Sequence, residues 1–121
     1  MHSADNLIFH ICRREAWEEA LRTGTYAGSE IDQRDGFIHF SAADRVRETA
    51  AIYLRGVEGL VLIGVDPASL GAALRWETSR DGIAFPHLYG ALAADRTVSV
   101  WDLPVGSEGF HVFPPFLMET Q

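Results

Sequence analysis

The chain has 121 residues, of which 47% are hydrophobic and 22% are charged, and this composition indicates one globular domain rather than a disordered segment. Its formal net charge of −7 argues against extended binding to nucleic acid or to an anionic membrane, because both would be repelled. All ten basic residues are arginine, which excludes a Schiff-base lysine and a P-loop lysine.

The N-terminal part of the chain predicts a strand followed by a helix. Residues 7–11 are apolar, with β-branched and aromatic side chains among them, apart from His10, which is the single polar side chain of the expected first strand. A helix is expected over residues 13–23, with Gly24 at its C-terminal end. Its apolar side consists of Ala16, Trp17, Ala20 and Leu21. Residues 26–35 are polar and turn-rich, so we expect an exposed loop there.

A strand with one polar face is expected over residues 36–41. Residues two apart in a strand share a face, so His39 and Ser41 project together while Ile38 and Phe40 point the other way. Ser41 precedes a helical run and is predicted to be its N-cap. The apolar stripe of that helix consists of Val46, Ala50, Tyr53 and Leu54, and Gly56 ends it.

The C-terminal half predicts mostly strands. Residues 59–65 are continuously apolar, which predicts a central strand covered on both faces, and residues 66–69 form a turn or a short helical start. The alternation in residues 74–78 places Arg75 and Glu77 on one face. The last strand is expected over residues 97–103.

Two further segments of this half have distinct characters. The segment Phe85-Pro86-His87-Leu88-Tyr89-Gly90 is strand-like and projects His87 and Tyr89 to the same side. Residues 104–121 form an aromatic, proline-punctuated tail that we expect to pack on the domain. We attribute Trp17, Trp76 and Trp101 to core packing and assign no function to His2 or His111.

These elements predict a single α+β domain over residues 1–121. No glycine-rich phosphate loop is present, so a bound nucleotide would be held in another way. Cys12 is the only cysteine and reads as a small structural residue, and no intramolecular disulfide can form. No apolar run is long enough to cross a bilayer, and the N-terminus lacks a signal-peptide layout, so we expect a cytoplasmic protein.

Several motifs occur together in a characteristic order. They are Ile8-Phe9-His10-Ile11, Trp17 with Ala20, Gly24-x-Tyr26, Asp35-Gly36-Phe37-Ile38-His39-Phe40-Ser41, Trp76-Glu77 and Phe85-Pro86-His87-Leu88-Tyr89-Gly90. With them the chain resembles, over roughly residues 7–103, the bacterial and plant family catalogued as domain of unknown function nine-five-two. The resemblance implies an ADP-ribosyltransferase-like fold, in which a split, mostly antiparallel sheet with two or three helices forms a cleft for NAD.

The same resemblance suggests roles for individual residues. His10 resembles the first-strand histidine that holds a ribose hydroxyl in such transferases, and Glu77 resembles their later glutamate, so both are the catalytic candidates. The stacking tyrosine of that group aligns clearly with neither Tyr53 nor Tyr89. The candidate ligand-binding residues are His39, Ser41, His87 and Tyr89.

The leading functional prediction is binding of NAD, ADP-ribose or a related nucleotide, with NAD as substrate and with ADP-ribosyl transfer or glycohydrolysis as the implied chemistry. We expect a small-molecule partner. One alternative is a zinc site, because His10, His39, His87 and Glu77 supply suitable ligand types, although no close histidine spacing is present and no metal ligand is assigned. Another is a non-catalytic domain that binds a metabolite or a protein partner. For Glu77 the structural alternative is an ion pair with Arg75 or Arg80.

Overall fold

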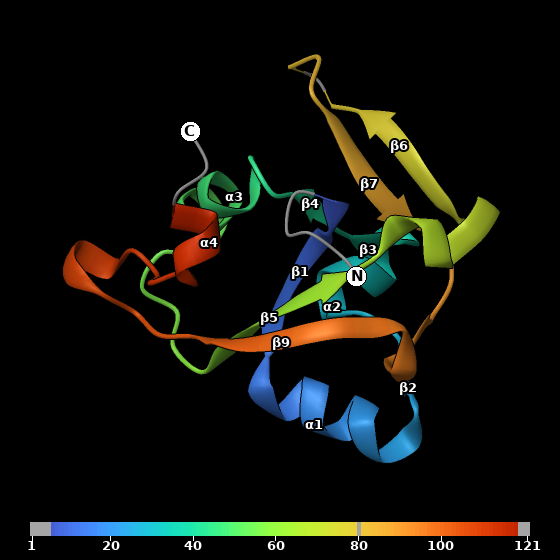
Figure 1. The fold of residues 1–121 in the computed structure, drawn as a ribbon, viewed down its shortest axis with the longest axis horizontal. Helices are drawn as coiled ribbons and strands as arrows, with labels where there is room; N and C mark the ends of the chain where they lie inside the picture. The colour runs from blue at the N-terminus through green and yellow to red at the C-terminus, as the bar shows by residue number, and fades with distance from the viewer. Residues whose placement is uncertain (1–5, 80, 119–121) are drawn as a thin grey trace.

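A four-stranded antiparallel sheet with the order β4-β1-β5-β9 organises the molecule. The structure is a computed structural model, which describes residues 6–79 and 81–118. The strands are β1 (Ile8–Arg13), β4 (Ser41–Ala42), β5 (Leu60–Val65) and β9 (Thr97–Leu103). All six residues of β5 are buried, and the strand lies between β1 and β9 (Figure 1), which confirms its predicted central position.

Two smaller antiparallel sheets complete the strand pairing. One has the order β3-β7-β6 and the other pairs β2 with β8. Their strands are β2 (Thr25–Tyr26), β3 (Ile38–His39), β6 (Leu74–Thr78), β7 (Ala84–Leu88) and β8 (Leu92–Ala93). In Figure 1 the β6–β7 hairpin extends away from the four-stranded sheet. The domain is therefore of the mixed α+β class with antiparallel sheets, as predicted.

The described residues contain four α-helices, more than the two or three expected. They are α1 (Arg14–Thr23), α2 (Glu30–Asp35), α3 (Val46–Tyr53) and α4 (Pro115–Met118), and a 3-10 helix spans Pro67–Ala73. Helix α1 ends at Gly24, whose φ of 91° is the left-handed conformation that glycine adopts most easily. Within the described part of the chain, every helix is too short or too polar to cross a membrane.

Both faces of the four-stranded sheet are covered by apolar side chains. On one face, Ile8 and Cys12 of β1 pack with Trp17 of α1 and with residues of the two smaller sheets. On the other face, Phe9 packs with residues of α3 and α4, and Figure 1 shows these two helices together on one side of the sheet. This arrangement explains why β1 and β5 have few polar residues, since each side of these strands faces a core.

The loop prediction for residues 26–35 is wrong in its second half, where α2 forms. Ser29 caps this helix, because its side chain accepts a hydrogen bond from the Asp32 N–H while Asp32 accepts one from the Ser29 N–H. This reciprocal pair is a capping box, with aspartate in place of the more usual glutamate. A helix of six residues with mostly polar side chains has little apolar periodicity, so the cap was its main sequence signal.

The single strand expected over residues 36–41 is also wrong, because the chain changes sheets at Phe40. β3 pairs with β7, whereas β4 pairs with β1, and the buried Phe40 between them donates its N–H to the Pro86 carbonyl at 3.0 Å. Ser41 therefore lies in β4 and is not an N-cap. Helix α3 begins later, at Val46, and its N-cap residue Arg45 makes no side-chain cap.

Three side chains that we assigned to the core are exposed. Leu21, Tyr53 and Trp76 have 59%, 76% and 51% of their surface accessible, respectively. Leu21 and Tyr53 flank the buried sides of short helices, where Ala20 and Ala50 make the contacts. Trp76 lies in β6, an edge strand of the three-stranded sheet. Its side chain lies on the opposite face of β6 from that of Glu77, because successive side chains of a strand alternate.

Candidate functional site

A cleft of about 580 Å³ lies where β1, α2, β3, α3 and β7 meet. Its polar wall includes His10, Asp32, Asp35, His39, Ser41, Thr49 and His87. Its aromatic wall includes Phe37, Phe40, Tyr53 and Phe85. The sequence motifs around His39 and His87 thus meet in space, because β3 pairs with β7 and places these two residues opposite each other.

Asp32 is a buried carboxylate that organises one side of the cleft. Its Oδ1 accepts hydrogen bonds from the backbone N–H of His39 at 3.1 Å and from the His39 ring Nδ1 at 2.6 Å. Its Oδ2 accepts from the backbone N–H of Ser29 at 2.7 Å. The other ring nitrogen of His39, Nε2, lies 3.2 Å from Asp35 Oδ2. His39 is therefore held between two carboxylates, and each of its ring nitrogens has a carboxylate partner.

The protonation of Asp32 and His39 is coupled through these contacts. Burial alone would raise the pKa of Asp32, but the hydrogen bonds from His39 and Ser29 outweigh burial and lower this pKa to about 2. The hydrogen bond to Asp32 raises the pKa of His39 above its usual value of 6.5, and Asp35 acts in the same direction. Both ring nitrogens of His39 face carboxylate oxygens, which can only accept, so these contacts favour the imidazolium form of His39 and the carboxylate form of Asp32.

His10 is buried beneath the cleft and both of its ring nitrogens have protein partners. Nδ1 lies 2.6 Å from the carbonyl oxygen of His39, which can only accept, so this nitrogen carries the proton. Nε2 lies 2.7 Å from the hydroxyl of Tyr26 and accepts from it. Burial lowers the pKa of His10, which agrees with a neutral ring.

The candidate Ser41 is buried at the edge of the cleft. Its hydroxyl lies 3.2 Å from the hydroxyl oxygen of Thr49, which itself donates to the Arg45 carbonyl at 3.1 Å. Because the only hydroxyl proton of Thr49 is donated to the Arg45 carbonyl, the Ser41 hydroxyl donates to Thr49. The lone pairs of Ser41 are then the groups that can accept a hydrogen bond from a ligand.

Glu77 forms a second cluster with His87 and Tyr89. Its Oε1 lies 2.7 Å from the His87 Nδ1 and accepts the Tyr89 O–H at 2.8 Å. The hydrogen bond from His87, followed by that from Tyr89, lowers the pKa of Glu77, so the group is a carboxylate. The shared face predicted for His87 and Tyr89 is consistent with their common partner.

The model of a family described as "Protein of unknown function (DUF952)" matches residues 11–100. The chain belongs to the DUF952 family. This is the family of unknown function that the sequence motifs indicated.

Solved structures of a similar protein have the same fold. The crystal structure of protein CC0527 from Caulobacter crescentus shares 40% identity, covers 93% of this chain and 98% of its own, and superposes with a TM-score of 0.88. The solution NMR structure of CC0527 gives 42% identity, coverage of 86% and 90%, and a TM-score of 0.78. No curated protein matches the chain.

The DUF952 cleft gathers some of the predicted site residues but not all. His10, His39, Ser41 and His87 line it, whereas Glu77 and Tyr89 are absent from its wall. Glu77 contacts the cleft only through His87. Arg80, one of the expected ion-pair partners of Glu77, lies outside the described residues. Among the described residues, the Glu77 carboxylate pairs with the His87 ring and not with Arg75.

Sequence reasoning missed Asp32 and Tyr26 as site residues. Asp32 was assigned to a loop, although its spacing of three from Ser29 could have indicated a capping box. Tyr26 belongs to the Gly24-x-Tyr26 motif, but nothing local to it predicts a contact with His10, because the two residues meet only in the tertiary structure.

The zinc alternative gains no support from this geometry. Across residues 6–79 and 81–118, no three His, Cys, Asp or Glu side chains lie close enough together to hold a metal ion. His10 and His39 also use both ring nitrogens on protein partners. A metal would therefore have to displace existing hydrogen bonds.

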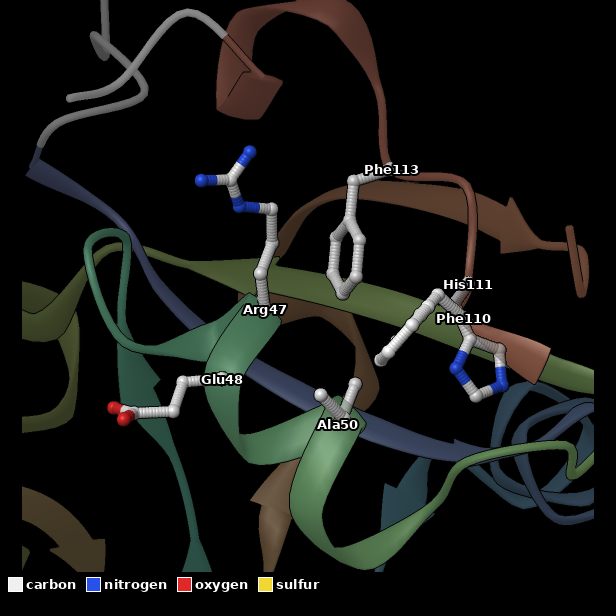
Figure 2. A pocket seen from close by; sticks show the side chains of 7 residues that line it. Arg47, Glu48, Ala50, Phe110, His111 and Phe113 are labelled. Atoms are coloured by element: carbon white, nitrogen blue, oxygen red, sulfur yellow. The ribbon is translucent and has the colours of Figure 1, made fainter. Parts of the chain in front are cut away.

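A smaller pocket of about 280 Å³ lies between α3 and the C-terminal segment (Figure 2). Phe110, His111 and Phe113 from that segment face Ala50 of α3. His111 is buried and its Nε2 donates to the Val57 carbonyl at 2.8 Å, while its Nδ1 finds no hydrogen-bond partner among the described residues. Since Phe113 belongs to the same core cluster as Ala50, we attribute this pocket to the packing of the C-terminal segment against α3.

Proposed function

We propose that the large cleft of this DUF952 protein binds a nucleotide of the NAD or ADP-ribose type. The observation that carries the proposal is the presence of flat aromatic rings and hydroxyl-binding groups in one cavity. Phe85 and Tyr53 offer faces on which a base or a nicotinamide ring can stack. Ser41 offers lone pairs that can accept a hydrogen bond from a ribose hydroxyl. The volume of about 580 Å³ lies in the range typical of small-molecule sites.

Two further features support the same ligand class. The resemblance to the ADP-ribosyltransferase-like group supplies a precedent for a nucleotide in a cleft of this kind, by analogy of fold. The first turn of α3 reaches the cleft at Val46, and no side chain caps this helix end. The partial positive charge at a helix start favours an anionic group such as a phosphate.

The proposal differs from the transferase analogy in the roles of His10 and Glu77. His10 would have to break a hydrogen bond to the His39 carbonyl or to Tyr26 before it could hold a ribose hydroxyl. Glu77 faces His87 and Tyr89 instead of the cavity, so it cannot contact a ribose directly in this arrangement. Ligand binding is therefore proposed without direct contact from either residue.

Calorimetric titration with NAD and with ADP-ribose tests this function. Phe85→Ala removes a stacking face and is expected to weaken binding by about 5- to 150-fold, since base stacking on an aromatic ring contributes about 1–3 kcal/mol. Phe110→Ala is the matched control, because this ring lines only the smaller pocket. Equal affinities for the two variants, or no binding of either nucleotide by calorimetry and by NMR shift mapping, would contradict the proposal.

A further inference from the structure

His87 differs from the other two histidines of the cleft in having one ring nitrogen available. Its Nδ1 is 2.7 Å from Glu77 Oε1, and a carboxylate can only accept, so Nδ1 carries the proton. In a neutral imidazole the lone pair is then on Nε2. Among the described residues, no hydrogen bond to this Nε2 is present, whereas His10 and His39 use both nitrogens.

The ring of His87 is also held in a fixed orientation beside the cavity. It stacks on Phe37 with a centroid distance of 4.1 Å and an interplanar angle of 24°. It meets the His39 ring edge-on at 5.5 Å. Because His87 lines the cleft and its side chain is only 16% exposed, the ring is ordered yet reachable from the cavity.

Tyr89 fixes the carboxylate that orients His87. Its hydroxyl donates to the same oxygen of Glu77 that accepts from His87. The guanidinium of Arg75 lies 5.0 Å from the centroid of the Tyr89 ring, which adds a cation–π contact on the outer side. The Glu77 carboxylate thus holds one nitrogen of the His87 ring, and the ring itself lines the cavity. Histidine acts as a general base in this arrangement, because its second nitrogen is free to accept a proton.

We propose that His87 is the general base of the cleft and activates a water molecule for hydrolysis of a bound NAD-type ligand, with Glu77 as its positioning residue. This inference rests on the function proposed above. Nε2 of His87 removes a proton from water as the water oxygen bonds to the ribosyl C1 carbon. The bond from that carbon to the pyridinium nitrogen breaks, and its electron pair leaves with neutral nicotinamide. His87 then releases the proton to solvent, so NAD and water give ADP-ribose, nicotinamide and one proton.

Single-turnover release of nicotinamide, measured with protein in excess over NAD, tests the step separately from binding. His87→Gln is expected to slow release by about 10²- to 10⁴-fold, the usual contribution of a general base, while the NAD dissociation constant stays close to that of the wild type. His87→Asn provides a second variant if the first does not fold. Glu58→Gln, an exposed carboxylate far along the chain from this cluster, is the control for loss of a negative charge and should release nicotinamide normally.

The role of Glu77 needs a readout that a purely structural residue would not change. Long-range ¹H–¹⁵N NMR reports which nitrogen of His87 carries the proton, and we expect the Nδ1–H form in the wild type. Glu77→Ala removes the acceptor of the Nδ1–H, so it should populate the Nε2–H form and slow nicotinamide release in parallel.

The outcomes separate the two proposals. Tight NAD binding without protein-dependent nicotinamide release, or release unaffected by His87→Gln, would overturn the general base but leave nucleotide binding intact. An Nε2–H tautomer in the wild type would overturn it on independent grounds. Failure of NAD and ADP-ribose to bind would instead refute the proposed function and, with it, the hydrolytic step.

Discussion

His39 donates two hydrogen bonds to one oxygen of Asp32, from its backbone N–H at 3.1 Å and from its ring Nδ1–H at 2.6 Å. This double contact joins α2, which contains Asp32, to β3, which contains His39. The second oxygen of the carboxylate caps α2 through Ser29. One buried side chain thus fixes the helix start, the strand and the imidazole that lines the cleft.

Replacing Asp32 with asparagine should destabilise the fold. The variant keeps the size of the side chain, but its amide nitrogen faces either the Ser29 N–H or His39, so at least one buried donor loses its acceptor. We expect a loss of about 2–4 kcal/mol, as for a charged acceptor with several buried partners. Urea unfolding at pH 7 measures this loss. Asp35→Asn is the matched control, because its side chain is 33% exposed and its contact with His39 should contribute at most about 1 kcal/mol.

Acid should weaken the fold through the same carboxylate. The pKa of Asp32 falls from 3.8 to about 2 on folding, so folding favours its charged form. The associated stability, about 2 kcal/mol for a shift of this size, is fully present above pH 4 and is lost as the pH falls toward 2. Urea midpoints measured from pH 5 to pH 2 should therefore decrease more steeply for the wild type than for Asp32→Asn. Parallel curves for the two proteins would exclude Asp32 as the source.

His39 and His10 should titrate on opposite sides of pH 6.5. The hydrogen bond to Asp32 raises the pKa of His39, so its contribution to stability is complete below pH 6.5 and is lost as the pH rises through the folded-state pKa. Burial lowers the pKa of His10, so its contribution is complete above pH 6.5 and is lost as the pH falls. NMR titration of the ring C–H resonances measures both. Asp32→Asn should move the His39 midpoint downward, and coincident midpoints in the wild type would contradict this assignment.

The sequence predicted those parts of the fold and site that depend on local periodicity. The strand at residues 60–65 follows from a continuous apolar run, whereas the strands at residues 74–78 and 97–103 and helix α1 follow from a repeat of apolar side chains. Each of these elements lies close to its expected position. The motifs made His39 and His87 candidates for one ligand site. They did not specify the pairing of β3 with β7 that places the two residues opposite each other.

What the sequence did not reveal depends on contacts between distant segments. The change of sheet at Phe40 is made by a hydrogen bond to Pro86, forty-six positions away, so no local pattern records it. The direction of Glu77 toward His87 depends on the register of β6 against β7. Alternation placed Glu77 on the correct face of its strand, but it could not show that His87 lies between this carboxylate and the cavity.

Gly28 is a backbone position on which the geometry of Asp32 depends. Its φ is 99°, and a Cβ atom added there would lie 2.7 Å from the Asp32 Cβ and 3.2 Å from a side-chain carbon of Ile38. Gly28→Ala should therefore combine the left-handed backbone penalty of about 1–2 kcal/mol with an overpacking cost of about 1–3 kcal/mol. Gly82→Ala is the matched control, because its φ of 82° carries the same backbone penalty while no atom from residues 6–79 and 81–118 is found within 4 Å of the added carbon.

The expected result is a clearly larger loss of unfolding free energy for Gly28→Ala than for Gly82→Ala in urea. If Gly28→Ala folds, displacement of Asp32 should also lower the NMR titration midpoint of His39, because the short contact to the carboxylate would lengthen. Equal losses for the two glycine variants, with an unchanged His39 midpoint, would show that Asp32 and Ile38 can move aside at no cost. In that case the position of the carboxylate would be set by Ser29 and His39 alone.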